Sequence, residues 1–205
     1  MKLVVATRNK HKLEEIRSIL GDLPVDLRAV DEYPKVSPIV EDGATLRANA
    51  IKKAVLTAID SGEWALADDT GLEVDALNGA PGVRSARYAG EDGNAARNLE
   101  KLMRDLMDRA DRGARFRCVI AMASPSGMAQ YVEGICEGTI TEASRGGAGF
   151  GYDPVFQPNG STETFAEMDP ARKNQISHRS AALEKARITW EILFRQPAPK
   201  DWPRR

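Results

Sequence analysis

The hydrophobic residues of the first third of the chain form short apolar runs and helical stripes. Residues 3–6 are an uninterrupted apolar run and predict a buried strand, which a polar loop at 7–12 follows. Apolar residues then recur at helical spacing over 13–20, and Gly21 ends the predicted helix. A second stripe over 44–59 predicts another helix, with Asp42 and Gly43 expected at its N-terminus.

The rest of the chain alternates between strand-like runs, turns and two further helices. The run at 64–67 predicts a buried strand, and the runs at 116–123 and 128–140 predict a hairpin around the turn at 125–127. The other expected segments are a short strand and loop over 24–38, an ordered loop over 78–93, a charged helix over 94–110, a Gly-rich segment over 145–158 and a last helix over 180–194.

The order of these elements predicts an α/β fold. Strand, helix, helix and strand come first and the hairpin follows, which favours a mixed β-sheet flanked by helices. We expect two lobes within a single domain over residues 1–195, and a loose tail over 196–205. A central cleft between the lobes is the expected place for an active site, because ligands commonly bind in such clefts.

Composition and charge narrow the class of partner. The 205 residues are 42% hydrophobic and 29% charged, as in globular proteins, and the net charge is −1. That balance gives no basic field for nucleic acid or for an anionic membrane, so neither is an expected partner. Cys118 and Cys136 lie in apolar runs without metal-ligand spacing, and we expect both to be reduced. No apolar segment has membrane-spanning length, and the prediction is a cytoplasmic protein.

Two adjacent carboxylates, Asp68 and Asp69, follow the strand-like run at 64–67. Adjacent acids repel, so a metal ion with a phosphate substrate would make the pair favourable. The alternative is an ordinary acidic turn. Neighbouring strand residues point to opposite faces, so both carboxylates would meet at one point only if the chain turns, as Thr70-Gly71 allows.

Two cationic segments precede the acid pair. The loop at 7–12 joins a strand to a helix N-terminus, where free N–H groups favour anions; a capped helix with solvated lysines is the alternative. Glu41 lies just before the second predicted helix, and Lys53 within it could contact phosphate or balance the carboxylates. In the alternative, Asp42 caps that helix and Lys53 is solvated.

Two later segments have the composition of a nucleotide pocket. Residues 146–154 are rich in glycine, which lets backbone approach a ligand, and Phe150 could stack on a base. Lys173 and the run 177–179, which holds His178, offer donors to a base edge or a phosphate. The alternatives are a plain loop with Phe150 in the core and a histidine that only begins a helix.

Taken together, these motifs resemble the family of inosine/xanthosine triphosphate pyrophosphatases, from Met1 to about Arg187. The segments that carry the resemblance are TRNKHK at 7–12, EDGA at 41–44, NAIKKA at 49–54, ADDTGLEVDALNGAPGVRSARYAG at 67–90, GFGYDPVF at 149–156, FAEM at 165–168 and KNQISHR at 173–179. The long match at 67–90 and the final SHR are the most specific.

The resemblance implies roles for these residues, a Mg²⁺ cofactor, an elongated mixed α/β fold and a homodimer. Asp69 would be the catalytic proton acceptor and a Mg²⁺ contact, with Glu41 and Asp68 as further metal ligands. The substrate-binding residues would be Thr7, Arg8, Asn9, Lys10, His11, Lys12, Lys53, Thr70, Phe150, Gly151, Tyr152, Asp153, Lys173, His178 and Arg179.

The chain departs from the family pattern at a few positions, and none removes a carboxylate or cation that the chemistry requires. Arg8 stands at a usual glycine, which could alter the phosphate loop or add a phosphate contact. The other departures are Leu46 for Phe, Ala48 for Glu, Thr70 for Ser, Arg84 for an aromatic residue, and the lead-in Gly146-Gly147-Ala148.

The predicted function is Mg²⁺-dependent hydrolysis of dITP, ITP or XTP between the α- and β-phosphates, which removes damaged purine nucleotides from the precursor pool. A 6-oxo base accepts a hydrogen bond at the position where adenine donates one. Donors near residues 177–179 would therefore select hypoxanthine or xanthine over adenine. Two alternatives remain open: a related pyrophosphatase for modified pyrimidine nucleotides, and a nucleotide-binding sensor without catalysis.

Overall fold

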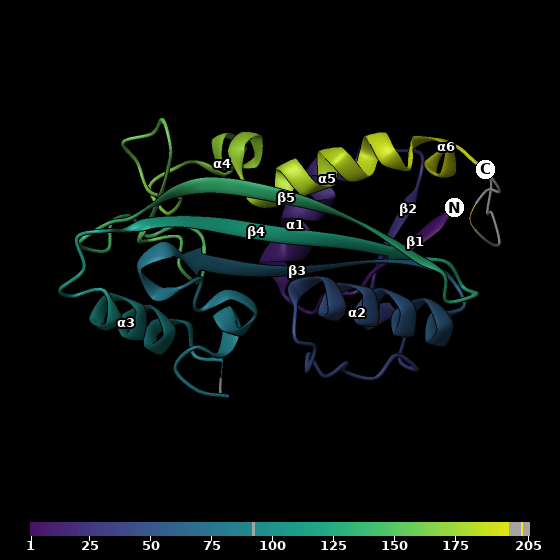
Figure 1. Cartoon of the computed structure of the whole chain (residues 1–205). Coiled ribbons are helices and arrows are strands. Elements are labelled where there is room, and N and C mark those ends of the chain that lie inside the picture. The colour runs from purple at the N-terminus through teal and green to yellow at the C-terminus, as the bar shows by residue number, and fades with distance from the viewer. Residues whose placement is uncertain (92, 197–201, 203–205) are drawn as a thin grey trace. The chain divides into compact units, whose positions relative to one another are not determined.

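The computed structural model describes residues 1–91, 93–196 and 202. Its strands and α-helices alternate from residue 2 to residue 123, after which two more strands and then three α-helices follow (Figure 1). The strands are β1 (Lys2–Val5), β2 (Asp26–Ala29), β3 (Trp64–Val74), β4 (Gly113–Ala123), β5 (Ala129–Ile140) and β6 (Phe156–Pro158). The α-helices are α1 (Lys10–Leu20), α2 (Leu46–Ser61), α3 (Ala95–Asp105), α4 (Pro170–Ile176), α5 (His178–Thr189) and α6 (Glu191–Phe194).

All six strands belong to one mixed sheet in the order β2-β1-β3-β4-β5-β6. β1 pairs in parallel with β2 and with β3, whereas β5 pairs antiparallel with β6. β4 and β5 are neighbours joined by a tight turn, in which Gly127 N–H donates to the Ser124 carbonyl. The predicted mixed α/β sheet with flanking helices is therefore confirmed, and so is the hairpin.

The chain forms two compact units. The first unit contains Met1–Asp69, Val119–Gly134 and the described residues of Ala182–Arg205, and the second contains the described residues of Thr70–Cys118 and Ile135–Ala181. The predicted boundary at residue 195, the elongated shape and the central cleft stay predictions.

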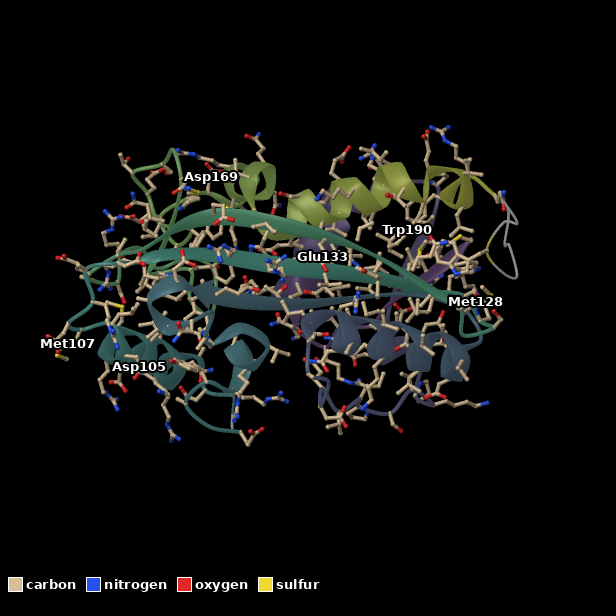
Figure 2. The ribbon with its side chains drawn as sticks, viewed as in Figure 1. Asp105, Met107, Met128, Glu133, Asp169 and Trp190 are labelled. Atoms are coloured by element: carbon tan, nitrogen blue, oxygen red, sulfur yellow. The ribbon has the colours of Figure 1, made fainter. Side chains whose placement is uncertain are left out.

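In the first unit, helices cover both faces of the sheet. α2 runs along one face of the strands and α5 with α6 along the other (Figure 1). The predicted stripe of α2 is buried at Ala50, Ala54 and Ala58, each fully inaccessible, because small side chains let the helix approach the strands closely. The last helix was predicted as continuous, but it breaks at Trp190, whose buried ring donates its N–H to Gln130 of β5 at 3.1 Å (Figure 2).

The core of the second unit is aromatic. The ring of Phe116 on β4 lies 4.7 Å from that of Phe156 on β6 and 6.0 Å from that of Phe165. α3 adds Leu102 and the residue after its end, Leu106, to the same cluster. The helix ends at Asp105, not at 110, and Met107 just beyond it is 74% exposed (Figure 2).

The predicted tail falls mostly outside the described residues. Of it, Gln196 and Trp202 are described. The Trp202 ring lies 5.0 Å from that of Trp64 and donates its N–H to the Met128 carbonyl at 2.8 Å. None of the helices in the described parts of the chain is long and apolar enough to cross a membrane.

The N-cap of α2 corrects one sequence prediction. The helix begins after Thr45, whose hydroxyl accepts the Ala48 N–H at 3.1 Å, while Asp42 pairs with Lys52 at 2.6 Å. The expected N-terminus at Asp42 and Gly43 was therefore wrong. Thr45 is the N-cap because its extended backbone lets the side chain reach the N–H groups of the first turn, as a capping residue must.

We expect Thr45→Ala to destabilise the protein by about 1 kcal/mol, because it leaves a helix N–H without its capping oxygen. Asp42→Ala serves as the matched control, since it removes an exposed ion pair with Lys52, worth roughly 0–1 kcal/mol. Urea unfolding of both variants makes the comparison. A larger loss for Asp42→Ala would contradict the assignment of the cap.

Candidate active site

The acid pair lies inside strand β3 and not at its end. β3 continues through Asp68, Asp69, Thr70 and Gly71 to Val74, so the predicted turn at Thr70-Gly71 was wrong. Pairing with the neighbouring strand β4 keeps the backbone extended, which outweighs the local tendency of one glycine to break a strand. Successive side chains of a strand point to opposite faces. Both carboxylates are therefore buried, but in different surroundings.

Each carboxylate faces its own lysine. Asp68 Oδ2 lies 2.8 Å from Lys12 Nζ of α1, and Asp69 Oδ1 lies 3.9 Å from Lys53 Nζ of α2. The parallel register explains the first contact, because Val5 of β1 pairs with Leu66 of β3. The loop that leaves β1 then passes beside the next residues of β3. Lysines from two helices thus offset the repulsion between neighbouring acids.

Lys53 joins the segment before α2 to the acid pair. Its Nζ donates to Glu41 Oε1 at 2.8 Å and to the Asp68 carbonyl at 2.6 Å. Only 8% of Lys53 is exposed, so the alternative of a solvated lysine was wrong. Burial lowers the pKa of Lys53, but the charges of Asp68, Asp69 and Glu41 outweigh that effect and leave it raised. The lysine is therefore a fixed positive charge.

Asn49 directs Glu41 toward this lysine. The Gly43 N–H donates to Asn49 Oδ1 at 2.7 Å, and a Cβ at Gly43 would lie only 2.6 Å from that oxygen. Gly43 is required for this close approach of the backbone to α2. Asn49 and Lys53 are one helical turn apart on the buried face of α2, so the same face that guides the 41–43 segment also binds its carboxylate.

Asp69 has an unusual acidity for an aspartate. Burial raises its pKa from 3.8 to about 6, Lys53 opposes the shift, and the nearby charge of Glu41 adds to it. A carboxylate with a pKa of about 6 is ionised at neutral pH and basic enough to accept a proton. This combination of burial and a charged partner is typical of functional carboxylates.

The chemistry of this group fits Mg²⁺ when phosphate supplies the remaining oxygens. Across the described part of the chain, no three His, Cys, Asp or Glu residues are grouped so that they could hold a metal ion by themselves. Glu41 and Asp69 both approach Lys53, and Mg²⁺ commonly binds through one or two carboxylates plus substrate phosphates. A cation here would also compensate the burial of Asp69. Asp68, in contrast, is engaged with Lys12.

The predicted phosphate loop is organised around a helix cap. Asn9 Oδ1 accepts the His11 and Lys12 N–H groups at 3.0 and 3.3 Å, and Thr7 Oγ1 accepts the Asn9 N–H at 3.2 Å. Asn9 is therefore the N-cap of α1, as the alternative of a capped helix predicted. Lys10 and His11 are exposed at the start of α1. Arg8 is turned toward Asp31 and the Val36 carbonyl.

In the second unit, Asp153 shapes the Gly-rich loop. Its Oδ2 accepts the Phe150 N–H and a hydrogen bond from Lys173 Nζ, both at 2.9 Å. Lys173 Nζ also lies 4.9 Å from the centre of the Phe150 ring, a cation–π distance. Gly149 has φ +74°, and a Cβ there would fall 2.2 Å from Asp153 Oδ2, so the loop requires glycine. Three predicted residues are therefore in direct contact.

The SHR run begins α5. Ser177 Oγ accepts the Ser180 N–H at 3.2 Å and caps the helix. The buried His178 ring stacks on Phe116 at 4.5 Å with 21° between the planes, and Arg179 Nη2 donates to Thr70 Oγ1 at 3.3 Å. Phe116 was not singled out from the sequence, since nothing local distinguishes it from an ordinary core residue.

Tyr152 connects the Gly-rich loop to β3 through Ser85. Its hydroxyl donates to the Ser85 carbonyl at 2.8 Å, and Ser85 Oγ accepts the Leu72 N–H at 2.8 Å. Burial raises the pKa of Tyr152, so its hydroxyl stays a donor. Ser85 is a second residue that sequence reasoning missed; only its position within the 67–90 segment pointed to it. Gly151 beside Tyr152 has φ +63°, a conformation that favours glycine.

We expect Asp69→Asn to stabilise the metal-free protein at pH 7.5 by roughly 2–3 kcal/mol. The folded-state pKa of about 6 lies above the unfolded value, so the stability that the protonated carboxyl contributes is complete below pH 3.8 and lost as pH rises through 6. Urea unfolding with EDTA at pH 7.5 and 4.5 measures the difference, which should shrink at the lower pH. Asp60→Asn, at an exposed position of α2, is the control. An Asp69→Asn variant that is less stable than the wild type at both pH values would contradict the raised pKa of Asp69.

Comparison with known proteins places the chain in a family. The model of the Ham1 family matches residues 3–188. The chain is 53% identical to the dITP/XTP pyrophosphatase of Syntrophobacter fumaroxidans, over 88% of this chain and 78% of the relative. It is 50% identical to the dITP/XTP pyrophosphatase of Desulforamulus reducens, over 95% of this chain and 96% of the relative.

Solved structures agree with the sequence relatives. A HAM1 protein from Coxiella burnetii is similar with a TM-score of 0.86 and 41% identity, covering 94% of this chain and 99% of its own. The Ham1 protein of Staphylococcus aureus gives a TM-score of 0.84 at 36% identity, covering 94% of this chain and all of its own. A family match over most of the sequence, with relatives at this level of identity, shows that the chain belongs to the Ham1 family.

Proposed function

We propose that the chain is a nucleoside-triphosphate pyrophosphohydrolase that converts dITP, ITP and XTP to the monophosphate and pyrophosphate. Its relatives in several bacteria are named dITP/XTP pyrophosphatases. The observation that carries the proposal for this chain is the pair of buried carboxylates on β3, each facing a different lysine. Such an arrangement suits a reaction in which one carboxylate handles a proton while fixed cations offset phosphate charge.

Asp69 is the proposed proton acceptor. Its raised pKa allows it to take the proton of the attacking water near neutral pH, and Lys53 stabilises the ionised form before the reaction. As the water oxygen bonds to the α-phosphorus, the bond from that phosphorus to the bridging oxygen breaks and pyrophosphate leaves. Asp68 takes a different role, because its carboxylate lies 2.8 Å from Lys12 Nζ and fixes that lysine.

Glu41 and Asp69 are the proposed Mg²⁺ ligands from the protein. When bound, Mg²⁺ would neutralise charge on the phosphates and orient them. We therefore narrow the predicted metal set from Glu41, Asp68 and Asp69 to Glu41 and Asp69. Asp68 contributes by holding Lys12, and the side chains of Lys12 and Lys10 are proposed to bind phosphate.

The groups proposed to recognise the base are in the second unit. Phe150 offers a ring for stacking and is held in place by Asp153 and Lys173. His178 and Arg179 are buried donors, which suit the 6-oxo acceptor of hypoxanthine and xanthine and leave the 6-amino group of adenine unmatched. A homodimer and a cytoplasmic location remain proposals that the family resemblance supports. Cys118 and Cys136 are buried thiols that form no disulfide, which fits a reducing compartment.

We expect the wild-type protein to release pyrophosphate from ITP in the presence of Mg²⁺, and Asp69→Asn to lower kcat by at least about 10²-fold, because the water loses its proton acceptor. Asp42→Asn is the matched control: it changes an exposed aspartate of the same segment as Glu41, which pairs with Lys52, and should leave kcat unchanged. Near-normal turnover by Asp69→Asn would overturn its role.

A substrate panel separates the alternatives. Hydrogen-bond recognition predicts that kcat/KM for ITP and XTP exceeds that for ATP by as much as about 10⁴. Equal values for ATP and ITP would contradict the proposed base recognition, and a preference for modified pyrimidine triphosphates would favour the related pyrophosphatase. Binding of ITP without pyrophosphate release at any Mg²⁺ concentration would favour the non-catalytic sensor.

A further inference from the structure

We propose that Arg8 is a positioning residue that clamps the loop between β1 and α1 to the segment at 30–36, and that it does not itself bind the triphosphate. The proposal rests on the proposed function, because residues of that loop are the ones assigned to phosphate. The Arg8 guanidinium donates through Nη1 to Asp31 Oδ1 and through Nη2 to the Val36 carbonyl, the latter at 2.9 Å. One side chain thus joins two segments that the backbone alone does not connect.

The sheet brings the two segments together. β1 and β2 are parallel neighbours whose last paired residues are Val5 and Ala29. Parallel strands leave the sheet at the same edge, so Arg8, three residues beyond Val5, and Asp31, two residues beyond Ala29, emerge side by side. The clamp therefore joins the segments that follow the C-terminal ends of β1 and β2, next to the start of α1.

The receiving segment is a firm anchor. Val30 and Val36 are 4% and 3% exposed, so both ends of the segment are held in the core. Between them, the Tyr33 N–H donates to the Val30 carbonyl at 3.0 Å and the Val36 N–H donates to the Tyr33 carbonyl at 2.9 Å. Pro34 occupies the second position of that last turn, where its fixed φ is favourable. Arg8 consequently holds its loop to a part of the protein that does not move readily.

Before Lys12, the loop has few contacts with the rest of the protein apart from those of Arg8. Residues 8–11 are exposed, and the Thr7 and Asn9 side chains accept hydrogen bonds from N–H groups of the loop itself, while Lys12 at its end contacts Asp68 of β3. A loop that must be ordered before it can bind phosphate has its binding free energy reduced by the free-energy cost of ordering it. A clamp to residues 30–36 reduces that cost in advance, and so acts on substrate affinity more than on the chemical step.

The geometry of the Arg8 guanidinium indicates that it links two segments and does not merely provide a positive charge for phosphate. Two donors of one planar group point in fixed directions toward a carboxylate and a carbonyl, which a lysine does not reproduce. A residue that only attracts phosphate would be replaced adequately by lysine. The pair is also largely solvent-exposed, at 46% for Arg8 and 64% for Asp31, so its loss should affect the loop without unfolding the protein.

The test compares Arg8→Ala, Arg8→Lys, Asp31→Ala and the Arg8→Ala/Asp31→Ala double variant in the full chain. Asp26→Ala is the matched control, because it breaks a similar exposed arginine pair, with Arg28, on the neighbouring strand. Amide hydrogen exchange of residues 9–12 without ligand is measured first, since it does not depend on any activity. The clamp predicts exchange about three- to tenfold faster in every variant except the control.

Steady-state kinetics with ITP and Mg²⁺ give the second readout. The clamp predicts that KM rises about three- to tenfold in Arg8→Ala, Arg8→Lys and Asp31→Ala while kcat stays within about twofold. The double variant should match the single variants, because one contact is removed only once.

The outcomes separate the possibilities. If Asp31→Ala leaves KM and exchange unchanged while Arg8→Ala raises KM and Arg8→Lys restores it, Arg8 contacts phosphate and the clamp is wrong. If no variant alters exchange of residues 9–12, the clamp is wrong whatever the kinetics. If the wild-type protein does not hydrolyse ITP, the proposed function fails, and hydrogen exchange still decides whether the clamp exists.

Discussion

The alternation of side chains along β3 is the constraint on which the rest of the site depends. Because the strand runs straight through Asp68 and Asp69, the two carboxylates project to opposite faces of β3. Two neighbouring buried charges of one sign need separate partners, and the fold supplies Lys12 from α1 and Lys53 from α2. The division between a carboxylate that positions a lysine and one available for chemistry follows from this geometry.

The second unit also buries a charged pair, Lys173 and Asp153, and places it beside aromatic rings. Lys173 is buried against Phe150 and Phe165, and Asp153 balances its charge while also holding the Phe150 backbone. A charged side chain in such a place is stable only when it is paired and its hydrogen bonds are made. The same contacts fix the orientation of Phe150, so the cost of burying the pair is linked to the placement of a ring that can stack on a base.

Sequence patterns anticipated much of the fold, but not which side chains of the candidate site contact one another. The apolar run at 3–6, the stripe of α2 and the hairpin were found where expected, because local hydrophobic spacing determines them. The turn at Thr70-Gly71 and the cap at Asp42 were wrong because strand pairing and backbone geometry override local preference. The stacking of His178 on Phe116 and the contact of Arg8 with Asp31 join residues far apart in sequence, which no local pattern encodes.

The most direct test of the account is whether Lys12 is coupled to Asp68 more strongly than to Asp69. Urea unfolding at pH 7.5 without metal gives this from two double-mutant cycles, Lys12→Met with Asp68→Asn and Lys12→Met with Asp69→Asn. A buried contact such as Lys12–Asp68 predicts a coupling of about 1–3 kcal/mol, and the cycle with Asp69 should give clearly less. Equal couplings, or a larger one for Asp69, would contradict the separation of the two carboxylates by strand β3.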